Sequence, residues 1–501
     1  LAIGASIFAS NIGSEHLIGL AGAGASSGMA MAHWEIQGWM ILILGWVFVP
    51  FYSRSMVYTM PEFLERRYNP QSRTILSVIS LVSYVLTKVA VTVYAGGLVF
   101  QQVFGIKELW GIDFFWIAAI GLVVLTALYT IFGGMKSVLY TSVLQTPILL
   151  LGSLIILVLG FKELGGWDEM MRVCGAVTVN DYGDTMTNLI RSNDDANFPW
   201  LGALIGSAII GFWYWCTDQF IVQRVLSGKN EKEARRGTIF GAYLKLLPVF
   251  LFLIPGMIAF ALHQKYIGAG GEGFLPMLAN GTANADAAFP TLVAKLLPAG
   301  VKGLVVCGIL AALMSSLASL FNSSAMLFTI DFYKRFRPET PEKKLVGIGQ
   351  IATVVIVILG ILWIPIMRSV GDVLYTYLQD VQSVLAPGIA AAFLLGICWK
   401  RTSAQGGMWG LISGMVIGLT RLGAKVYYSN AGEVADSTFK YLFYDMNWLF
   451  FCGWMFLFCI IVVIVVSLAT EAPTAEKIQG LVFGTATKEQ KASTRASWNH
   501  W

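Results

Sequence analysis

The sequence contains very little charge for its length. Asp, Glu, Lys and Arg together make up 13% of the 501 residues, about half of the roughly 25% that is usual in soluble domains. Hydrophobic residues make up 56%, so the chain has too little polar surface to face water on all sides. This composition excludes an ordinary soluble domain, a disordered chain, a collagen-like chain and a nucleic-acid-binding module. Lipid must therefore solvate much of the protein.

The chain also lacks motifs in which cysteines form disulfides or bind a metal. Its six cysteines show no CxxC or metal-ligand spacing, so a disulfide framework is not expected. The sequence has no nucleophile–base pair and no metal motif at a single membrane depth. This argues against an intramembrane enzyme. The chain starts at Leu1, inside an apolar stretch and without Met, so we expect that further sequence precedes it.

Long apolar runs dominate what is present. Twelve runs approach the length of about 20 residues that crosses a bilayer, and charge, Pro or Gly clusters end each of them. We expect an all-α polytopic membrane protein with a single transmembrane domain over 1-501. The runs lie at 2-28, 33-53, 74-104, 113-132, 139-161, 199-222, 237-262, 299-330, 346-367, 371-397, 406-428 and 447-470.

Basic residues gather in alternate loops. Half of the 34 Lys and Arg residues lie in the short loops after the second, fourth, sixth, eighth and tenth runs. Loops rich in Lys and Arg are usually cytoplasmic, and the polar tail over 471-501 then lies in the cytoplasm as well. We expect a multi-pass protein of the plasma (cell inner) membrane.

Two of the runs are interrupted at mid-membrane depth. The first breaks at 10-16, where Ser, Asn, Gly, Glu and His stand close together, and the sixth breaks at 216-219. The five-span separation predicts two inverted repeats, 1-162 and 199-397, followed by additional helices over 398-470. Matched breaks free backbone groups that lipid cannot satisfy, and they are typical of a midplane site in a secondary transporter. Two kinked helices packed for structure alone are the alternative.

Small residues line one face of the eighth run at helical spacing. Such faces are common where helices pack closely. Placed against the freed carbonyls of the first break, the hydroxyls would form a mostly neutral oxygen cage, which suits a weakly bound monovalent cation. The face consists of Gly308, Ala312, Ser315, Ser316, Ser319 and Ser323.

Three ionisable residues, His16, Glu35 and Lys245, lie at membrane depth. Each could serve structure alone, as a buried histidine, an interfacial carboxylate or a snorkelling lysine. Intramembrane charges are costly, however, and they usually face cavities. With further amide and aromatic side chains they supply donors, acceptors and ring faces that fit a polyhydroxylated, uncharged solute. These further side chains are Asn11, Tyr214, Trp215 and Gln379.

Several specific motifs are distributed over almost the whole chain. They are IGASIFASNIGS at 3-14, TMPEFL at 59-64, WYWCTDQ at 213-219 with VQR at 222-224, YLKL at 243-246, SSLAS at 315-319 through Asp331, and FLLG at 393-396 with WKR at 399-401. These motifs resemble the sodium:solute symporter family, specifically its sodium/glucose (galactose) cotransporter branch. The resemblance implies a LeuT-type five-plus-five inverted repeat with broken first and sixth helices and about 12 transmembrane helices in this chain. Bacterial relatives commonly have one more helix at each end, which agrees with cut ends here.

The resemblance implies a site for the co-transported sodium ion. Ser142 stands where relatives that couple two sodium ions have Asp, so we expect one sodium ion per sugar. The ion would be held by the backbone carbonyls of Ala9, Ile12 and Ala312 and the hydroxyls of Ser315 and Ser316.

The resemblance also implies a sugar site between two gates. His16 stands where bacterial galactose transporters of the family tend to have Gln, and Gly211 replaces a sugar-binding Asn. Both departures bring the sequence closer to the animal glucose type. The sugar site would consist of Asn11, His16, Glu35, Tyr214, Trp215, Lys245 and Gln379, with Tyr214 also as inner gate and Leu20, Trp34 and Tyr375 as the outer hydrophobic gate.

Together these features predict a sodium-coupled secondary active symporter that imports glucose or galactose by alternating access. Symporters of the same fold for myo-inositol, an anion or an amino acid are alternatives, and Glu35 disfavours an anion. A non-accumulating channel would need an uninterrupted pore, and a nutrient sensor would usually have a signalling domain longer than the tail. The expected partners are the sugar, sodium and the bilayer, without nucleic acid; the sequence leaves the oligomeric state open.

Overall fold

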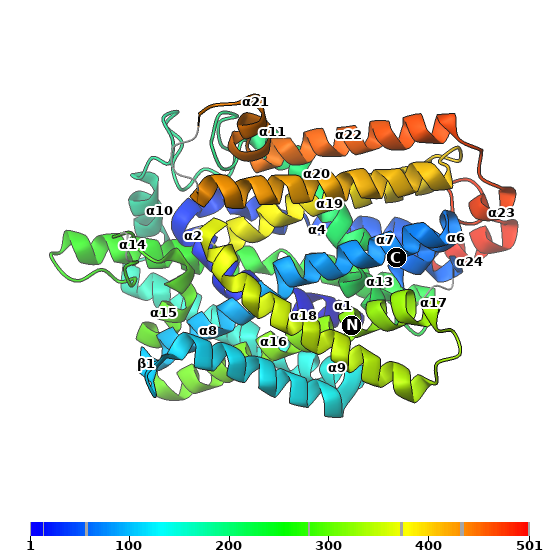
Figure 1. Cartoon of the computed structure of the whole chain (residues 1–501). Helices are drawn as coiled ribbons and strands as arrows, with labels where there is room; N and C mark the ends of the chain where they lie inside the picture. Colours follow the sequence, from blue (N-terminus) through cyan, green and yellow to red (C-terminus); the bar gives the residue numbers. More distant parts are fainter. Residues whose placement is uncertain are drawn as a thin grey trace.

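The computed structural model describes residues 2–13, 15–55, 59–278, 281–370, 374–430 and 435–498. Within these ranges the only sheet is an antiparallel hairpin of β1 (Glu108–Leu109) and β2 (Ile112–Asp113). The long helices run side by side along one axis (Figure 1). The expectation of an all-α architecture is therefore confirmed apart from this short hairpin.

In the first part of the chain, α-helices alternate with short segments of π-helix or 3₁₀-helix, which have η labels. The segments are α1 (Ala2–Asn11), η1 (Glu15–Leu20), α2 (Ala21–Ser27), η2 (Gly28–Met31), α3 (Ala32–Ile36), α4 (Gly38–Ile43), η3 (Leu44–Phe48), α5 (Val49–Ser55), α6 (Met60–Arg67), α7 (Pro70–Ser83), η4 (Tyr84–Val89), α8 (Ala90–Phe104), α9 (Phe114–Leu164) and α10 (Trp167–Gly175).

The second part of the chain has the same alternation. Its segments are α11 (Trp200–Gly211), η5 (Phe212–Thr217), α12 (Gln219–Leu226), α13 (Glu231–Leu244), η6 (Val249–Leu253), α14 (Ile254–Gly268), η7 (Ala285–Ala287), α15 (Ala288–Leu296), α16 (Ala299–Met326), η8 (Leu327–Tyr333), α17 (Lys334–Phe336), α18 (Glu342–Val370), α19 (Leu374–Cys398), α20 (Ala404–Asn430), α21 (Thr438–Lys440), η9 (Tyr441–Asp445), α22 (Trp448–Ala469), α23 (Ala475–Ile478) and α24 (Lys488–Trp498).

Capping residues determine where several helices begin. The side chain of Asn69 accepts a hydrogen bond from the Ser72 amide at 2.8 Å at the start of α7. Pro70 follows as the first residue of that helix, where its missing N–H needs no partner. Asn230 caps α13 in the same way through the amide of Glu233, at 2.8 Å.

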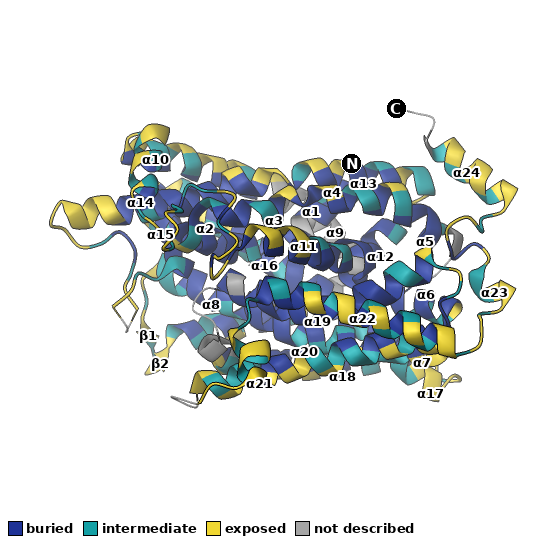
Figure 2. Ribbon diagram, turned by 90° about the horizontal axis from the view of Figure 1, so that it is seen from above, coloured by how far each residue is buried: buried dark blue, intermediate teal, exposed yellow. Residues whose placement is uncertain are grey.

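Nine helical segments in the described ranges are long and apolar enough to cross a membrane. The chain is thus an integral, multi-pass membrane protein. The runs predicted at 113-132 and 139-161 both lie in one helical segment, α9, which has no helix end between them. Glycine weakens a helix without forbidding it. The hairpin before α9 and helix α10 after it both lie at the left in Figures 1 and 2, so this segment doubles back along its length.

The two ends of the helical bundle differ in the loops that they present. Helices α6 and α17, with the basic loops around Arg66 and Lys334, lie at the right in Figure 1, as do α23 and α24 of the tail. The acidic segment that follows α9, which includes α10, lies at the opposite end. This arrangement agrees with the two sides predicted from the basic residues.

Small residues bring pairs of helices close together. A Cβ atom added to Gly388 of α19 would lie 2.9 Å from the Cα of Gly414 in α20. A Cβ atom on Gly4 of α1 would lie 2.5 Å from the carbonyl oxygen of Gly237 in α13. Glycine is therefore required at both crossings, as is common where membrane helices pack on one another.

The outer helices present apolar side chains to their surroundings. Leu151 on α9, Leu362 on α18 and Trp454 on α22 are all more than half exposed, and Figure 2 shows exposed residues along α18 and α22. Apolar surface of this extent is solvated by lipid in a membrane protein.

The tail packs against the end of the bundle that is rich in basic residues. The ring of Phe483 lies 4.8 Å from that of Phe51 in α5, and Lys477 Nζ donates to the carbonyl of Glu65 at 3.0 Å. The tail is thus folded onto the bundle over its described residues.

Candidate functional site

The first break separates α1 from η1. The amide of Gly13 donates to the carbonyl of Asn11 at 3.0 Å, and the amide of His16 donates to the carbonyl of Gly13 at 3.2 Å. In a continuous helix these two amides would bond to the carbonyls of Ala9 and Ile12. At the break, the carbonyls of Ala9 and Ile12 therefore lose their usual helical donors. These are two of the predicted sodium ligands.

The second break separates η5 from α12 at Asp218, whose backbone is extended with φ −76° and ψ 127°. Its carboxylate accepts hydrogen bonds from the Phe220 amide at 3.2 Å and the Tyr84 hydroxyl at 2.9 Å. Lys88 Nζ lies 3.1 Å from the other oxygen of this carboxylate. The break is thus stabilised by two side chains from η4, in the third predicted span.

Lys245, directly after α13, is the centre of a buried polar cluster. Its Nζ lies 2.7 Å from Oε2 of Glu35 and donates to Oδ1 of Asn11 at 2.9 Å. Nε2 of His16 lies 3.1 Å from this ammonium and 3.3 Å from the Glu35 carboxylate. The three ionisable residues that the sequence placed separately at membrane depth therefore contact one another.

This polar cluster forms one side of a small, partly open cavity. The rings of Tyr214 and Trp215 meet edge to face with centroids 4.9 Å apart, and Asn11 Nδ2 donates to the Tyr214 hydroxyl at 3.2 Å. Six of the seven predicted sugar-site residues line the cavity, and Glu35 contacts two of them. The lining residues are Asn11, Glu15, His16, Trp34, Gln37, Ile210, Gly211, Tyr214, Trp215, Lys245, Tyr375, Gln379 and Gln382.

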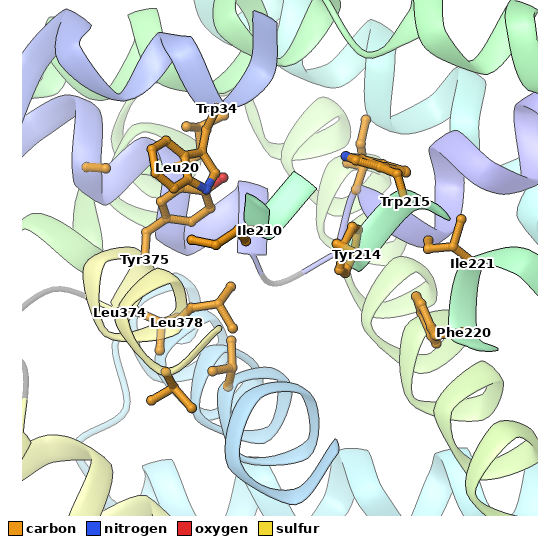
Figure 3. Close-up of a cluster of buried hydrophobic side chains, with 14 of the residues drawn as sticks. Leu20, Trp34, Ile210, Tyr214, Trp215, Phe220, Ile221, Leu374, Tyr375 and Leu378 are labelled. Atoms are coloured by element: carbon orange, nitrogen blue, oxygen red, sulfur yellow. The ribbon is translucent and has the colours of Figure 1, made fainter. Parts of the chain in front are cut away.

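The residues predicted as the outer gate gather at one side of this cavity, where Figure 3 shows Leu20, Trp34 and Tyr375 close together. All three are buried. The Tyr375 hydroxyl donates to Oε1 of Glu35 at 3.4 Å, and its ring packs so closely on Gly19 that a Cβ there would lie 2.8 Å away. Trp34 and Tyr375 therefore form part of the cavity wall at this side.

The predicted sodium ligands lie where the first break meets α16. A Cβ atom on Gly13 would lie 2.6 Å from the hydroxyl of Ser316. This hydroxyl is buried and has no hydrogen-bond partner among the described residues, and Ala312 and Ser315 are also buried. The geometry thus brings an unpaired hydroxyl to the segment that frees two carbonyls.

A second, narrower cavity adjoins this position. It is lined by Gly13 and Ser316 and also by Lys88, and it shares Asn11 and Glu15 with the larger cavity. The region of the proposed cation site is therefore next to the polar cavity.

Several residues of the site were missed from the sequence. Lys88 is an ionisable residue within the run 74-104, so the criterion that identified Lys245 would have found it. Gln37 and Gln382 carried no signal of this kind, because amides occur in many membrane helices. The side chain of Ser142, on which the expectation of one sodium ion depends, lies outside the described side chains.

Comparisons with known proteins agree with this architecture. The model of the family described as "Sodium:solute symporter family" matches residues 1–414. Human sodium/myo-inositol cotransporter 2 is 37% identical over 496 residues, which cover 96% of this chain and 72% of that protein. Sheep sodium/glucose cotransporter 1 is 39% identical over 487 residues, which cover 94% of this chain and 72% of that protein.

Among solved structures, a sodium-coupled sialic acid symporter in a substrate-bound, outward-open state has a TM-score of 0.70 at 20% identity, and the match covers 94% of this chain and 90% of that one. This likeness supports a LeuT-type fold. The family and the relatives above are sodium cotransporters, so the chain is a transporter rather than an enzyme, and sodium is its co-transported ion. The protein belongs to the sodium:solute symporter family.

Proposed function

We propose that the protein imports an uncharged monosaccharide, glucose or galactose, together with sodium. The observation that carries this proposal is the cluster in which Lys245 Nζ lies within 3.1 Å of Glu35, Asn11 and His16 at the wall of the cavity. Hydroxyl groups both donate and accept hydrogen bonds, so a sugar can bind to this mixture of donors and acceptors. The rings of Tyr214 and Trp215 supply apolar faces for the C–H surface of a sugar ring.

The charges around the cavity favour a neutral solute. Lys245 is already paired with Glu35 at 2.7 Å, and Glu15 lines the same cavity. An anion would face these carboxylates without an unpaired cation to balance it, and like charges at a buried site are strongly unfavourable. The named relatives act on glucose or myo-inositol, so myo-inositol is the second candidate.

We assign sodium to the first break, between the carbonyls of Ala9 and Ile12 and the hydroxyls of Ser315 and Ser316, with the carbonyl of Ala312. Because Asn11 lies between the two carbonyls and also contacts Lys245, an ion that orders the break would also order one wall of the cavity. Sodium then raises sugar affinity because it binds better to the arrangement that is competent for sugar.

Finer features of the fold belong to the same proposal. We propose about 12 transmembrane helices, arranged as inverted repeats over 1-162 and 199-397 with additional helices over 398-470. The end of the bundle that includes α6, α17 and the tail faces the cytoplasm, and the membrane is the plasma membrane. Alternating access would open the cavity first past Leu20, Trp34 and Tyr375, and then past Tyr214.

Uptake by proteoliposomes tests the assignment. Labelled glucose, galactose and myo-inositol are offered separately with an inward sodium gradient, and again with potassium in place of sodium. We expect sodium-dependent accumulation of glucose or galactose, and stronger uptake of myo-inositol would favour the second candidate. Uptake that equilibrates without accumulation would indicate a channel and overturn the proposal.

A further inference from the structure

Gln37 is a buried amide at the junction between two helices. It follows the last residue of α3 and precedes α4, and it is 4% exposed. Its side chain lines the polar cavity, yet its Nε2 has no hydrogen-bond partner within the part of the chain that the structure describes. A buried amide donor without a partner is unfavourable, so its position in a solute cavity points to a group that arrives with the solute.

Gly211 leaves the space that the Gln37 side chain occupies. It is the last residue of α11, directly before the turn η5 that contains Tyr214 and Trp215. A Cβ atom at this position would lie 2.6 Å from Oε1 of Gln37. Any larger residue at 211 would displace the Gln37 amide. The Gln37 side chain therefore keeps its position because residue 211 is glycine.

Gln379 presents a second unpaired amide atom to the same cavity. Its Oε1 is buried without a hydrogen-bond partner from any described residue, and the residue is 4% exposed. The cavity thus contains one free amide N–H₂ group, from α3–α4, and one free amide oxygen, from α19. A hydroxyl-bearing ring can satisfy both at once, since each hydroxyl donates and accepts.

We propose that Gln37, placed by Gly211, is a substrate-binding residue that recognises one hydroxyl of the solute and so determines which sugars or polyols the protein selects. This inference depends on the proposed function, because it requires a polyhydroxylated solute in the cavity. It adds to that function a second set of contacts to the solute, separate from the ionic cluster around Lys245.

A scan of singly deoxygenated sugars tests the contact. For the unmodified protein, each deoxy analogue of the preferred sugar is compared with the parent by the concentration that gives half-maximal sodium-dependent uptake. Gln37→Met and Gln37→Leu remove the amide and retain an apolar side chain of similar length. We expect each variant to bind the parent sugar roughly five- to tenfold more weakly, with the sodium requirement unchanged.

The decisive result is the loss of discrimination at one hydroxyl. One deoxy analogue should weaken binding to the unmodified protein by the same factor and should cause no further loss in Gln37→Leu, because the contact is already absent. Gly211→Ala should reproduce this pattern by displacing the amide without removing it. Ile210→Val, at an apolar lining position next to Gly211, serves as the control and should retain discrimination at every hydroxyl.

The possible failures can be distinguished. If the unmodified protein shows no sodium-dependent uptake of any sugar or polyol, the proposed function fails and this inference fails with it. If the unmodified protein accumulates sugar but the Gln37 and Gly211 variants lose affinity equally for the parent and for every analogue, the inference alone is overturned. If Gln37→Leu does not fold, the same comparison is made with Gln37→Met and Gly211→Ala.

Discussion

Nζ of Lys245 lies 2.7 Å from Oε2 of Glu35, and both side chains are almost completely buried. Two residues that are 210 positions apart thus neutralise each other beside the solute cavity. Removing one partner of such a pair leaves an unpaired buried charge, which typically costs about 3–5 kcal/mol. The pair therefore has a structural role as well as the proposed role in solute binding, and the two roles can be separated.

Lys245→Met should lower the thermal unfolding temperature of the purified protein, because the charge of Glu35 is then unpaired. Adding Glu35→Gln should recover part of that stability, since both charges are then absent. Sugar uptake should stay low in the double variant, because the ammonium donor of Lys245 and the carboxylate acceptor of Glu35 are both lost. Recovery of full uptake together with stability would show that the pair has no role in solute binding.

Ser316→Ala should raise the sodium concentration needed for half-maximal uptake by about tenfold, the upper range for one hydrogen-bonding oxygen, while the protein folds normally. The Ser316 hydroxyl is buried, unpaired and next to Gly13 of the break. Ser324, on the same helix and also buried with a hydroxyl that no described residue pairs, lies two turns away and serves as the matched control. An equal effect of Ser324→Ala would argue against a site at Ser316.

The pair of Lys88 and Asp218 should hold the second break in place. The ammonium of Lys88 lies 4.5 Å from the centre of the Tyr214 ring, so we expect Asp218→Asn to release Lys88 and disturb the proposed inner gate. Transport rate should fall at least several-fold, with a smaller change in sodium affinity. Rates measured at saturating sugar test this, with Lys88→Met/Asp218→Asn as the variant that restores charge balance. An unchanged rate in Asp218→Asn would contradict this role.

Lowering the external pH should favour the closed outer gate through Asp286. Burial raises the pKa of this carboxyl to about 7, whereas hydrogen bonds from the Leu374 amide and Tyr94 oppose the shift. If opening hydrates the carboxyl and returns its pKa towards the ordinary value of 3.8, the closed state binds the proton more tightly. Protonation therefore favours closure as the pH falls through about 7.

The expected size of this effect follows from linkage. Between pH 8 and pH 6 the ratio of closed to open states should rise about tenfold, which would appear as a weaker apparent sugar affinity at acid external pH. Asp286→Asn, which cannot ionise, should remove this dependence. If the variant kept the same pH dependence, a titrating group other than Asp286 would be responsible for it.

The sequence predicted the two breaks because polar residues and glycine within an apolar run are a local signal. It also identified Lys245, Glu35 and His16, since each is ionisable at membrane depth. Their mutual contact depends on how η1, α3 and α13 pack, so the sequence could suggest a common site from their membrane depth and chemistry but could not predict which of them touch. The same limit explains why Gln37 was missed: its importance arises from its position against Gly211, on another helix.

The helical segment α9, which is assigned as helix throughout although it doubles back, shows a different limit. Two glycines and one lysine between apolar runs suggested the end of a helix at 133-134, but none of these residues forbids helical backbone. Whether the chain unwinds there depends on the neighbouring helices. The basic loops, in contrast, were assigned correctly to one end of the bundle, because their number and spacing are properties of the sequence alone.

Accumulation of sugar at a fixed membrane potential tests coupling most directly. Proteoliposomes are loaded with the same sodium concentration on both sides, and a potassium diffusion potential of 100 mV, negative inside, is imposed. One sodium ion per sugar predicts a steady-state accumulation of about 50-fold, because a unit charge gains about 2.3 kcal/mol at this potential. Equal sugar concentrations on both sides would contradict sodium-coupled sugar transport, and accumulation far above 50-fold would contradict a single coupled ion.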